Sequence, residues 1–526
     1  MKNIPHININ RKVADGMFRE LFGQKALYRV LNIYGGSGVG KSHFKEYLKD
    51  KYLQKSKEVV TLEIDFQNRL YHNSKLAIMQ LAKELEQKYD FDFITLWKAY
   101  AILWQKRYEH SPIMYASDLP YVHEIRKLLK VDKKGNTFIN IIKGLFKDSI
   151  YKELQELKKL DTQAIEDKLY RFFATDLKNM LANKKLKDCV ILVDNHNLLE
   201  ERVYTTPCKK DSWLRELATQ VGKDAMLVVF SQKPIEWYKC NVAWRSQLKE
   251  YEMENFSYKD ATRYLKESGI HESALRVAIT NTSGHNPFYL SLGKHAFFQE
   301  EDNPIPTVKS DIIKTFLATQ NKEMIKLLKA LSFTRVFNIG LINSIIKQFK
   351  IDLDDKSIQE LFKYDFVKKV GDKKYALDEY FIKEIKNYIN KEESKDYISY
   401  IFSYYEDILH SLDKEIIRNT PELIDEVLEE AWYYLKLINK DPLVHFEWLD
   451  YYIARFYMYA AWEAFISRYH EIIPFLKKEK NSTSKEKLSA LYNNLAGLYE
   501  SIGESKKAKD YYNKFLDLSR LEKLSA

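Results

Sequence analysis

The residues of this chain best suited to chemistry form one short glycine-rich segment. Positions 35–42 read Gly-Gly-Ser-Gly-Val-Gly-Lys-Ser, the G-x-x-x-x-G-K-S pattern of a phosphate-binding loop. Glycines permit a tight bend in which successive backbone N–H groups point at one centre and can hold a phosphate. The Lys41 side chain would reach the β- and γ-phosphates, and the Ser42 hydroxyl would take one Mg²⁺ coordination position. This spacing predicts a nucleoside triphosphate site, with ATP or ADP and Mg²⁺ as ligands.

A carboxylate suited to magnesium ends a later segment. Residues 188–194 read Asp-Cys-Val-Ile-Leu-Val-Asp, a continuous apolar run that is typical of a buried parallel strand with an acid at its carboxyl end. Asp194 would hold Mg²⁺ directly or through water. No acid follows at once, and the asparagine at position 195 can orient water but cannot accept its proton. Fast hydrolysis is therefore not expected, unless the loop turns back to bring in Glu200 or Glu201.

Two further segments could contact the nucleotide. Ser231 ends the apolar run 225–231 and, with Gln232, could reach the γ-phosphate as a sensor; the alternative is a buried serine bonded only to backbone. Pro287 follows a glycine turn at a helix start, where a stiff turn could close as a lid. The candidate catalytic residues are Lys41, Asp194 and Ser231, and the candidate magnesium ligands are Ser42 and Asp194. The candidate nucleotide-binding residues are Gly35, Gly36, Ser37, Gly38, Val39, Gly40, Lys41, Ser42, His43 and Pro287.

A common structural framework has to bring these residues to the same edge of a β-sheet. The phosphate loop follows an apolar run at 28–33 and opens a helical pattern at 42–52, and residues 58–66 alternate as in a strand. Strands separated by helical stretches indicate a doubly wound parallel sheet, whose ligands bind beyond the carboxyl ends of the strands. Because the loop, Asp194 and Ser231 all fall at such ends, we expect an α/β P-loop NTPase domain.

The length of 526 residues suggests about three domains. We expect the P-loop NTPase domain over 1–295, with a helix-rich insertion at about 74–187 and lid helices at about 256–295. Three helical patterns followed by a hairpin with a Gly-Asp turn predict a winged helix over 308–390. Residues 391–526 show no strand signal and predict an all-α domain.

The end of the chain carries the spacing of a tetratricopeptide unit, a helix pair of about 34 residues. Small residues at Ala496 and Ala508 would let two helices approach closely, while aromatic residues such as Tyr499 fill the gaps. A single repeat cannot bury its own apolar face, so segments 396–435 and 446–478 are candidate degenerate units. An ordinary helical bundle is the alternative. Such a region would bind a protein ligand.

Composition narrows the class of protein. Hydrophobic residues make up 45% of the chain, enough for packed cores, and the net charge of +10 is spread along it without a basic stripe. DNA is therefore an open but not a favoured partner. The three cysteines (Cys189, Cys208 and Cys240) show no metal-binding spacing and are expected to be reduced thiols. The polar N-terminus and the short apolar runs predict no membrane partner and a cytoplasmic protein.

In their order, these features resemble the STAND class of signal-transduction P-loop ATPases. The match comprises the phosphate loop, the strands that end at Asp194 and Ser231, and Phe-Ser-Tyr-Lys-Asp-Ala-Thr-Arg-Tyr-Leu at 256–265, which is similar to a helix opening of the class. The stretch 284–290 is similar to its lid turn, with one extra residue between glycine and proline. The expected winged helix and repeat complete the order, so that the resemblance covers roughly 10–390 and the repeat type.

The resemblance implies a two-state switch. ADP would be clamped between the nucleotide domain and the winged helix, and a ligand of the C-terminal helices would favour ATP exchange, opening and homo-oligomerisation. The chain departs from the class in three places. No second acid follows Asp194, Gln232 and Lys233 replace an arginine, and Asp378 and Glu379 stand near the position of a nucleotide-contacting histidine. Two acids there would repel a diphosphate.

Three functions follow from these observations. The first is an ATP-binding signalling switch with slow ATPase activity that senses a partner through the C-terminal helices, in bacterial defence or transcriptional control. The second is a DNA-binding transcriptional regulator under ATP control, although the helix at 341–350 offers only Asn343 and Gln348 for base reading. The third is a DNA-processing ATPase, against which the missing second acid argues.

Overall fold

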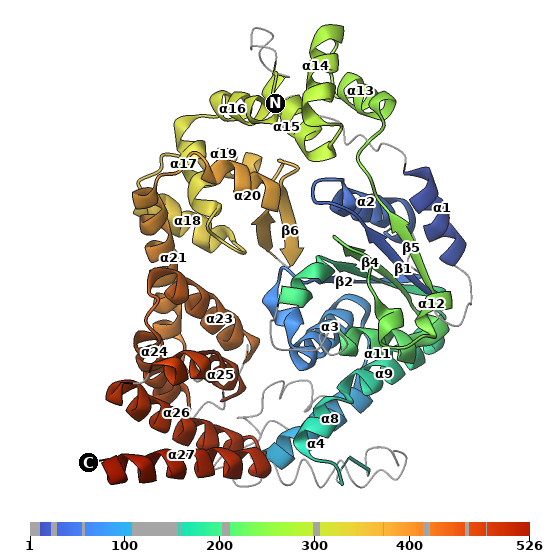
Figure 1. The fold of residues 1–526 in the computed structure, drawn as a ribbon. Helices are drawn as coiled ribbons and strands as arrows, with labels where there is room; N and C mark the ends of the chain where they lie inside the picture. The colour runs from blue at the N-terminus through green and yellow to red at the C-terminus, as the bar shows by residue number, and fades with distance from the viewer. Residues whose placement is uncertain are drawn as a thin grey trace. The chain divides into compact units, whose positions relative to one another are not determined.

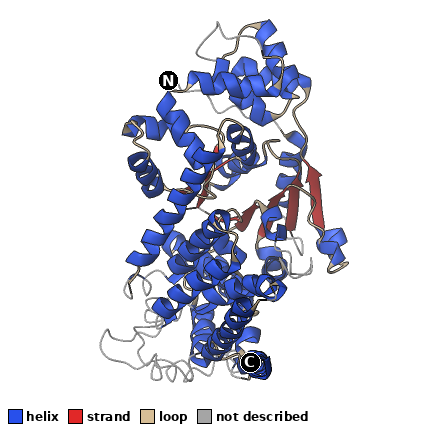
Figure 2. Cartoon of the chain, turned by 60° about the vertical axis from the view of Figure 1, so that its left-hand side comes forward, coloured by secondary structure: helices blue, strands red, loops and turns tan. Residues whose placement is uncertain are grey.

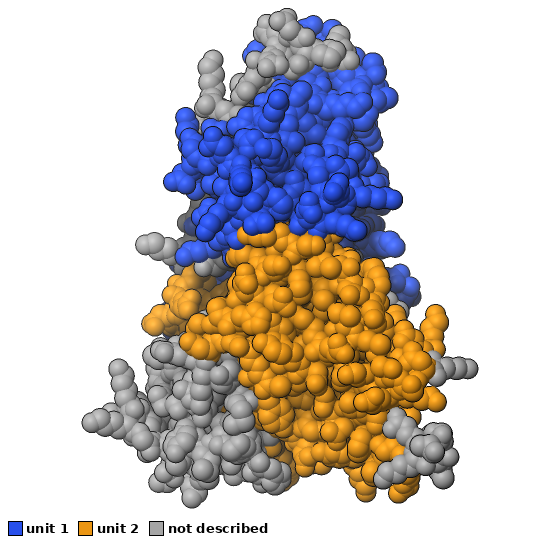
Figure 3. Space-filling view, turned by 90° about the vertical axis from the view of Figure 1, so that its left-hand side faces the viewer, with its two compact units in different colours: residues 1–72, 178–397 blue, residues 73–177, 398–526 orange. Residues whose placement is uncertain are grey.

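The computed structural model describes most of the chain as two compact units. Unit 1 comprises residues 1–72 and 178–397, and unit 2 comprises 73–177 and 398–526 (Figure 3). Much of the segment expected as a helical insertion, including 108–155, lies outside the described residues. The described residues are 11–22, 29–54, 58–107, 156–157, 159–201, 211–297, 306–371, 373–413, 416, 421–457, 462–479 and 481–525.

Unit 1 contains one parallel sheet of five strands in the order β2-β3-β4-β1-β5 (Figures 1 and 2). Three of its strands, β1, β3 and β4, are buried along nearly their whole length, which explains the continuous apolar runs of β3 and β4. In register, Asp65 lies opposite Asp194, and Tyr34 lies opposite both Ser231 and Glu252. The carboxyl ends of all five strands therefore share one edge. The strands are β1 (Arg29–Tyr34), β2 (Val59–Asp65), β3 (Asp188–Asp194), β4 (Met226–Ser231) and β5 (Leu248–Glu252).

This arrangement confirms the predicted α/β P-loop NTPase fold. The expected strands at 58–66, 188–194 and 225–231 are present within one residue of each end. The edge strand β5 was not predicted. Its sequence, Leu-Lys-Glu-Tyr-Glu, places charged residues at exposed positions and lacks the apolar run of a central strand.

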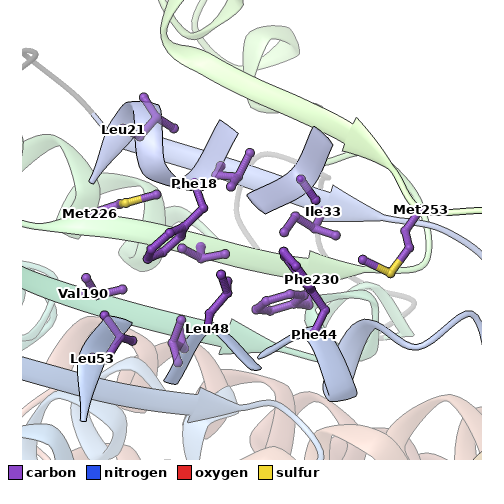
Figure 4. Close-up of a cluster of buried hydrophobic side chains, with 14 of the residues drawn as sticks. Phe18, Leu21, Ile33, Phe44, Leu48, Leu53, Val190, Met226, Phe230 and Met253 are labelled. Atoms are coloured by element: carbon purple, nitrogen blue, oxygen red, sulfur yellow. The ribbon is translucent and has the colours of Figure 1, made fainter. Parts of the chain in front are cut away.

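The helices nearest the phosphate loop bury one face of the sheet. Phe18 and Leu21 of α1 (Lys12–Leu21), with Phe44 and Leu48 of α2 (Lys41–Leu48), reach the strand residues in Figure 4. Burying side chains of this size contributes about 1.5–3 kcal/mol each. The other helical elements of this part of unit 1 are η1 (Lys49–Leu53), η2 (Arg69–His72), η4 (His196–Glu201), α11 (Ser212–Val221), η5 (Gly222–Asp224), η6 (Trp237–Lys239) and α12 (Trp244–Gln247).

The rest of unit 1 follows the sheet in the chain. Three helices lead from β5, and the third begins at Pro287, the predicted helix start. Four helices, a hairpin and a further helix come next, over the segment expected as a winged helix; Phe337 and Tyr375 add a bridge to the hairpin. The elements are α13 (Tyr258–Glu267), α14 (Ser273–Ser283), α15 (Pro287–Phe297), α16 (Lys309–Thr319), α17 (Lys322–Leu331), α18 (Ile339–Gln348), α19 (Asp355–Leu361), β6 (Val367–Gly371), β7 (Lys374–Leu377) and α20 (Glu379–Lys386).

Unit 2 joins the described insertion helices to the C-terminal helices. Lys75 of α3 forms an ion pair with Glu463 of α25, and the Thr162 hydroxyl of α8 donates to Glu504 (2.8 Å), at the turn between α26 and α27. The insertion helices are α3 (Ser74–Tyr89), α4 (Ile94–Arg107), α8 (Thr162–Glu166) and α9 (Leu169–Asn183), which continues into unit 1. The C-terminal helices are α21 (Lys391–Ser411), which begins in unit 1, α23 (Pro421–Ile438), α24 (Pro442–Phe456), α25 (Trp462–Lys478), α26 (Ser482–Ser501) and α27 (Ser505–Ser525).

The predicted all-α C-terminal region is confirmed. Ala496 and Ala508 are both buried where α26 meets α27, as their small size predicted, and the Tyr499 ring stacks on Tyr511 with centroids 5.5 Å apart. Successive helices from α24 to α27 pack against one another. Each segment suggested as a degenerate unit contains parts of two helices.

Two expectations from the sequence bear on the cellular compartment of the protein, namely the lack of membrane spans and the redox state of its cysteines. Within the described ranges, no helix combines the length and the apolarity that a bilayer span requires. The expectation of reduced thiols is wrong for Cys240, which is disulfide-bonded, whereas Cys189 is free and buried. Cys208 lies outside the described residues.

Candidate functional site

The phosphate loop joins β1 to α2 and has the backbone that its glycines predict. Gly38 and Gly40 adopt φ values of 76° and 97°, a region that favours glycine, and Gly40 caps α2 in the left-handed conformation. At Gly35, a Cβ atom would lie 2.2 Å from the backbone oxygen of Met253, closer than any real contact. Glycine is therefore required at position 35 by close packing and at 38 and 40 by backbone conformation.

The start of α15 lies directly on this loop. The Phe288 amide donates to the Gly38 oxygen (3.1 Å), and the Asn286 side-chain nitrogen approaches the Ser37 oxygen (3.5 Å). A Cβ atom at Gly40 would lie 3.9 Å from Pro287. Pro287 thus lies beside the loop, and its role in a lid stays a prediction. Asn286 was not among the predicted site residues, although the Asn-Pro pair marks a turn.

Lys41 begins α2 and turns back over the loop. Its ammonium donates to the carbonyl oxygens of Gly35 (2.7 Å) and Gly36 (2.8 Å). Burial lowers the pKa of Lys41 to about 8, partly offset by nearby carboxylates such as Asp194. A phosphate that replaced these carbonyls would supply the charge that this ammonium lacks. Of the other predicted loop residues, Val39 is buried, Ser42 is half-buried and His43 is exposed.

Asp194, the predicted magnesium ligand, lies in a buried ion pair. Its Oδ2 atom accepts from the ammonium of Lys45 at 2.9 Å. Burial opposes the charge of both groups, but each stabilises the other, so the pKa of Lys45 is raised and that of Asp194 is lowered. Lys45 follows Lys41 by one helical turn, and this i, i+4 spacing is the signal that could have identified it.

A second carboxylate lies at the end of the neighbouring strand. Burial and the charge of Asp194 raise the pKa of Asp65 to about 6. The Asp65 carboxylate accepts from the side chain of Asn195 (2.8 Å) and from the amide of Gln67 (2.9 Å). Asn195, considered above as a residue that orients water, thus bonds to Asp65. The side chains of Glu200 and Glu201 lie outside the described residues.

The oxygen ligands that magnesium prefers meet at this edge. The Ser42 hydroxyl and the carboxylates of Asp194 and Asp65 are the residues that would hold it. Asp194 would have to exchange Lys45 for the metal, since both would use the same carboxylate. Groups of three or more His, Cys, Asp and Glu side chains that could hold a metal by themselves do not occur in the described part of the chain. In a complex with a nucleotide, its phosphates would supply further oxygen ligands.

Ser231, predicted as a sensor, is bonded within the sheet. Its buried hydroxyl donates to the Lys233 oxygen (2.6 Å) and accepts from the Asn32 side chain (2.9 Å). The next residue reaches the loop instead, because the Gln232 amide donates to the Ser37 hydroxyl (3.1 Å). Gln232, named above with Ser231 as a residue that could reach the γ-phosphate and as a departure from the class, is the contact between the end of β4 and the phosphate loop.

The β6–β7 hairpin and α20 bring charged residues close to Gln232 and the phosphate loop. The Gln232 amide also donates to Glu379, the first residue of α20 (3.2 Å). The carboxylate of Asp378 pairs with Lys368 of β6 at 2.6 Å. The repulsion that the sequence suggested for both acids is thus reduced at Asp378 by a lysine from the same hairpin, while no lysine or arginine among the described residues pairs with Glu379.

A buried polar cluster supports the segment that follows β3. His196 bonds to Asp211 (3.1 Å), which also accepts from Arg215 (2.8 Å) and from the Trp237 indole. Burial raises the pKa of the Asp211 carboxyl, but these donors, His196 first, outweigh burial and lower it. The cluster fixes the backbone two residues after Asp194. His196 and Trp237 are far in sequence from the Asp211–Arg215 pair, and sequence reasoning missed the cluster.

Comparisons with known proteins give a fold likeness only. No protein-family model matches the chain, and no curated protein matches it. Solved structures similar to it include a STAND protein with a tetratricopeptide repeat sensor from Pyrococcus horikoshii, at 12% identity and a TM-score of 0.46. That match covers 99% of this chain but 65% of the other, so this chain spans less than two thirds of its relative's length.

Two further solved structures are similar over about three quarters of the chain. One is a Walker-type ATPase of Pyrococcus abyssi, with 12% identity, a TM-score of 0.33, and coverage of 72% of this chain and 96% of that one. The other is the ORC2 protein of Aeropyrum pernix, with 10% identity, a TM-score of 0.33, and coverage of 74% and 96%. The assignment of a P-loop NTPase fold rests on this chain's own sheet and phosphate loop.

Proposed function

We propose that this chain is an ATP-binding regulatory switch of the STAND type with slow ATPase activity. The observation that carries the proposal is the set of contacts at the carboxyl edge of the sheet. The phosphate loop there touches the start of α15 and, through Gln232, the start of α20. A nucleotide held by the loop would act on both helices at once, which is what a nucleotide-controlled switch requires.

The residues of the loop would bind and orient the phosphates. The backbone amides and Lys41 supply positive charge. A Mg²⁺ ion held by Ser42 and Asp194 would neutralise part of the phosphate charge. Slow hydrolysis fits the surroundings of Asp194. The residue after it is Asn195, whose amide is bonded to Asp65, and Lys45 holds the Asp194 carboxylate itself. No carboxylate is thus placed directly after Asp194 to accept a proton from water.

Unit 2 is the proposed sensing region. It contains the insertion helices as well as the C-terminal helices, and the two groups are joined by the Lys75–Glu463 and Thr162–Glu504 contacts. In the chain, the insertion begins shortly after Asp65 and ends shortly before β3. A protein ligand bound to the C-terminal helices would therefore act on a segment joined to both strands that end at the magnesium-binding edge.

The alternatives receive less support. Reading DNA bases would need side chains that α18 offers sparsely, namely Asn343 and Gln348. In the hairpin that follows in the chain, Lys368 pairs with Asp378, which makes it less able to bind a DNA phosphate. A DNA-processing motor would need faster hydrolysis than the surroundings of Asp194 suggest. A nucleotide-dependent homo-oligomer and a cytoplasmic location belong to the proposal as predictions.

The proposal is tested on the purified full chain. Its bound nucleotide is identified after denaturation, and its mass and hydrodynamic radius are measured with ADP and with a non-hydrolysable ATP analogue. We expect bound nucleotide, and a radius or mass that differs between the two nucleotides. A protein that binds both but keeps the same radius and mass with each would contradict the switch.

A further inference from the structure

We propose that Gln232 and Glu379 form a latch that distinguishes a nucleoside triphosphate from a diphosphate. The latch rests on the proposed function, because it needs a nucleotide in the phosphate loop. It assigns a specificity role to two residues that no motif identifies. The ligand that opens it is a triphosphate with its magnesium ion.

One amide group joins three parts of unit 1. The Gln232 side-chain nitrogen lies 3.1 Å from the Ser37 hydroxyl in the phosphate loop and 3.2 Å from a carboxylate oxygen of Glu379. Gln232 directly follows β4, which pairs with β1, the strand that leads into the loop. The sheet therefore fixes the backbone of Gln232 relative to the loop. Any movement of Glu379 away from the loop must break the second bond.

At the start of α20, other contacts hold Asp378 in place, and Glu379 is the acid that would respond to a bound nucleotide. Asp378 caps the helix by accepting from the Tyr380 amide (2.9 Å), and Lys368 pairs with its carboxylate. The Glu379 side chain is exposed and accepts a hydrogen bond from the side chain of Gln232. Of the two acids at this end of α20, Asp378 is paired with a lysine and Glu379 is the one that bonds to Gln232 beside the loop.

The carboxylate of Glu379 lies near the place where phosphates would bind. Its charge and that of Asp378 both act on the ammonium of Lys41, the residue that reaches the β- and γ-phosphates in such loops. Like charges repel more strongly as their number rises and as water is excluded. A triphosphate carries more negative charge than a diphosphate and places it nearer to Ser37. Glu379 should therefore weaken triphosphate binding more than diphosphate binding.

The contacts of α20 with α15 indicate what would still hold α20 after Glu379 is released. The ring of Tyr380 packs on Phe288 (centroids 5.8 Å apart) and on Tyr289 (6.1 Å), so α20 is also held to α15. The Phe288 amide bonds to Gly38. A diphosphate would leave both routes from the loop to α20 intact, whereas a triphosphate would break the route through Gln232. The segment from α16 to α20 would then keep its contact with the loop through α15.

Titration calorimetry on the full chain tests the latch with ADP and a non-hydrolysable ATP analogue, each with Mg²⁺. Glu379→Gln removes the charge and keeps a side chain that can bond. We expect the affinity for the ATP analogue to rise about tenfold and that for ADP to change by less than about twofold. Glu392→Gln, which removes an exposed acid of α21, should leave both affinities unchanged.

Gln232→Leu provides the second arm, because it breaks the bridge and keeps the charge of Glu379. We expect limited proteolysis of the ADP-bound variant to resemble that of the wild-type chain bound to the ATP analogue. If Glu379→Gln leaves the ratio of the two affinities as in the wild-type chain, the latch is wrong even though nucleotide binds. If the wild-type chain binds neither nucleotide, the proposed function itself has failed. Similar thermal unfolding of the variants excludes misfolding as the cause.

Discussion

The ammonium of Lys45 lies 2.9 Å from the carboxylate of Asp194, and both side chains are buried. The acid placed to hold magnesium is therefore already neutralised by a lysine of the helix that follows the phosphate loop. Magnesium has to compete with Lys45 for this carboxylate, so the pair helps to set how strongly the nucleotide site depends on the metal.

Replacing Lys45 tests this relationship. Lys45→Met leaves Asp194 buried without its partner, and loss of one member of a buried pair typically costs about 3–5 kcal/mol of stability. We expect a lower unfolding temperature without ligand, and a larger rise in that temperature with Mg²⁺ and nucleotide than in the wild-type chain. Differential scanning fluorimetry measures both.

Lys326→Met is the control for that comparison, since it breaks a surface pair with Glu323 whose loss should lower the unfolding temperature much less. Equal unfolding temperatures for the two lysine variants would show that the buried pair has no special weight.

The opposite end of the sheet carries a second buried pair, with a different expected phenotype. Arg29 donates through two nitrogens to Asp188, both at 2.7 Å, at the amino ends of β1 and β3. Arg29→Met should lower stability by about 3–5 kcal/mol. Nucleotide affinity of the folded protein should stay unchanged, because the pair lies at the edge away from the loop. Chemical denaturation together with calorimetry separates the two effects, and a loss of affinity in folded protein would refute this separation.

Two glycines of the phosphate loop differ in what they tolerate. At Gly38 a Cβ atom would lie 2.8 Å from the Asn286 side chain, and φ is 76°, whereas at Gly36 the nearest atom would be 3.9 Å away. In the unliganded protein, Gly38→Ala should lower the unfolding temperature measurably, and Gly36→Ala should not. Matching unfolding temperatures for the two variants would mean that α15 does not rest on the loop as described.

The pH dependence of stability tests unit 2. Burial raises the pKa of Asp176 to about 6 from 3.8, although the Leu96 amide donates to this carboxylate. The folded state therefore binds a proton more tightly than the unfolded state, and this contribution to stability is lost as pH rises from about 4 to 6. Asp176→Asn should remove that loss and raise stability above pH 6 by about 1–3 kcal/mol.

Scanning calorimetry between pH 4 and pH 8 measures this effect. Asp167→Asn, an exposed change close by in the sequence, is the control. A variant at Asp176 that kept the wild-type slope between pH 4 and 6 would show that this carboxyl is not buried as described.

Much of the fold could be predicted because it is written in local patterns. The central strands are buried, so β3 and β4 have continuous apolar sequences, and the glycines of the loop follow β1 directly. β5 escaped prediction because an exposed edge strand keeps its charged residues. The partition of the chain into units also needs contacts between distant residues, such as Lys75 with Glu463.

The candidate site was predictable in its loop and in Asp194, and less so in its partners. The hydroxyl of Ser231 bonds to Asn32 of β1 and to the Lys233 oxygen, while Gln232 makes the contact with the loop. Asp65 was visible as the end of a strand, but its closeness to Asp194 depends on the order of strands. Pairs such as Lys368 with Asp378, and Gln232 with Glu379, depend on how the hairpin and α20 fold against the loop, which no spacing reveals.

The most direct test of the central claim is titration calorimetry of ADP, and of ATP with Mg²⁺, into the full wild-type chain and into Lys41→Ala. We expect one site per chain in the wild type, and a loss of affinity of at least about a hundredfold in the variant, which removes the ammonium that reaches the phosphates. A wild-type chain that binds neither nucleotide, or a folded Lys41→Ala variant that binds them equally well, would contradict it.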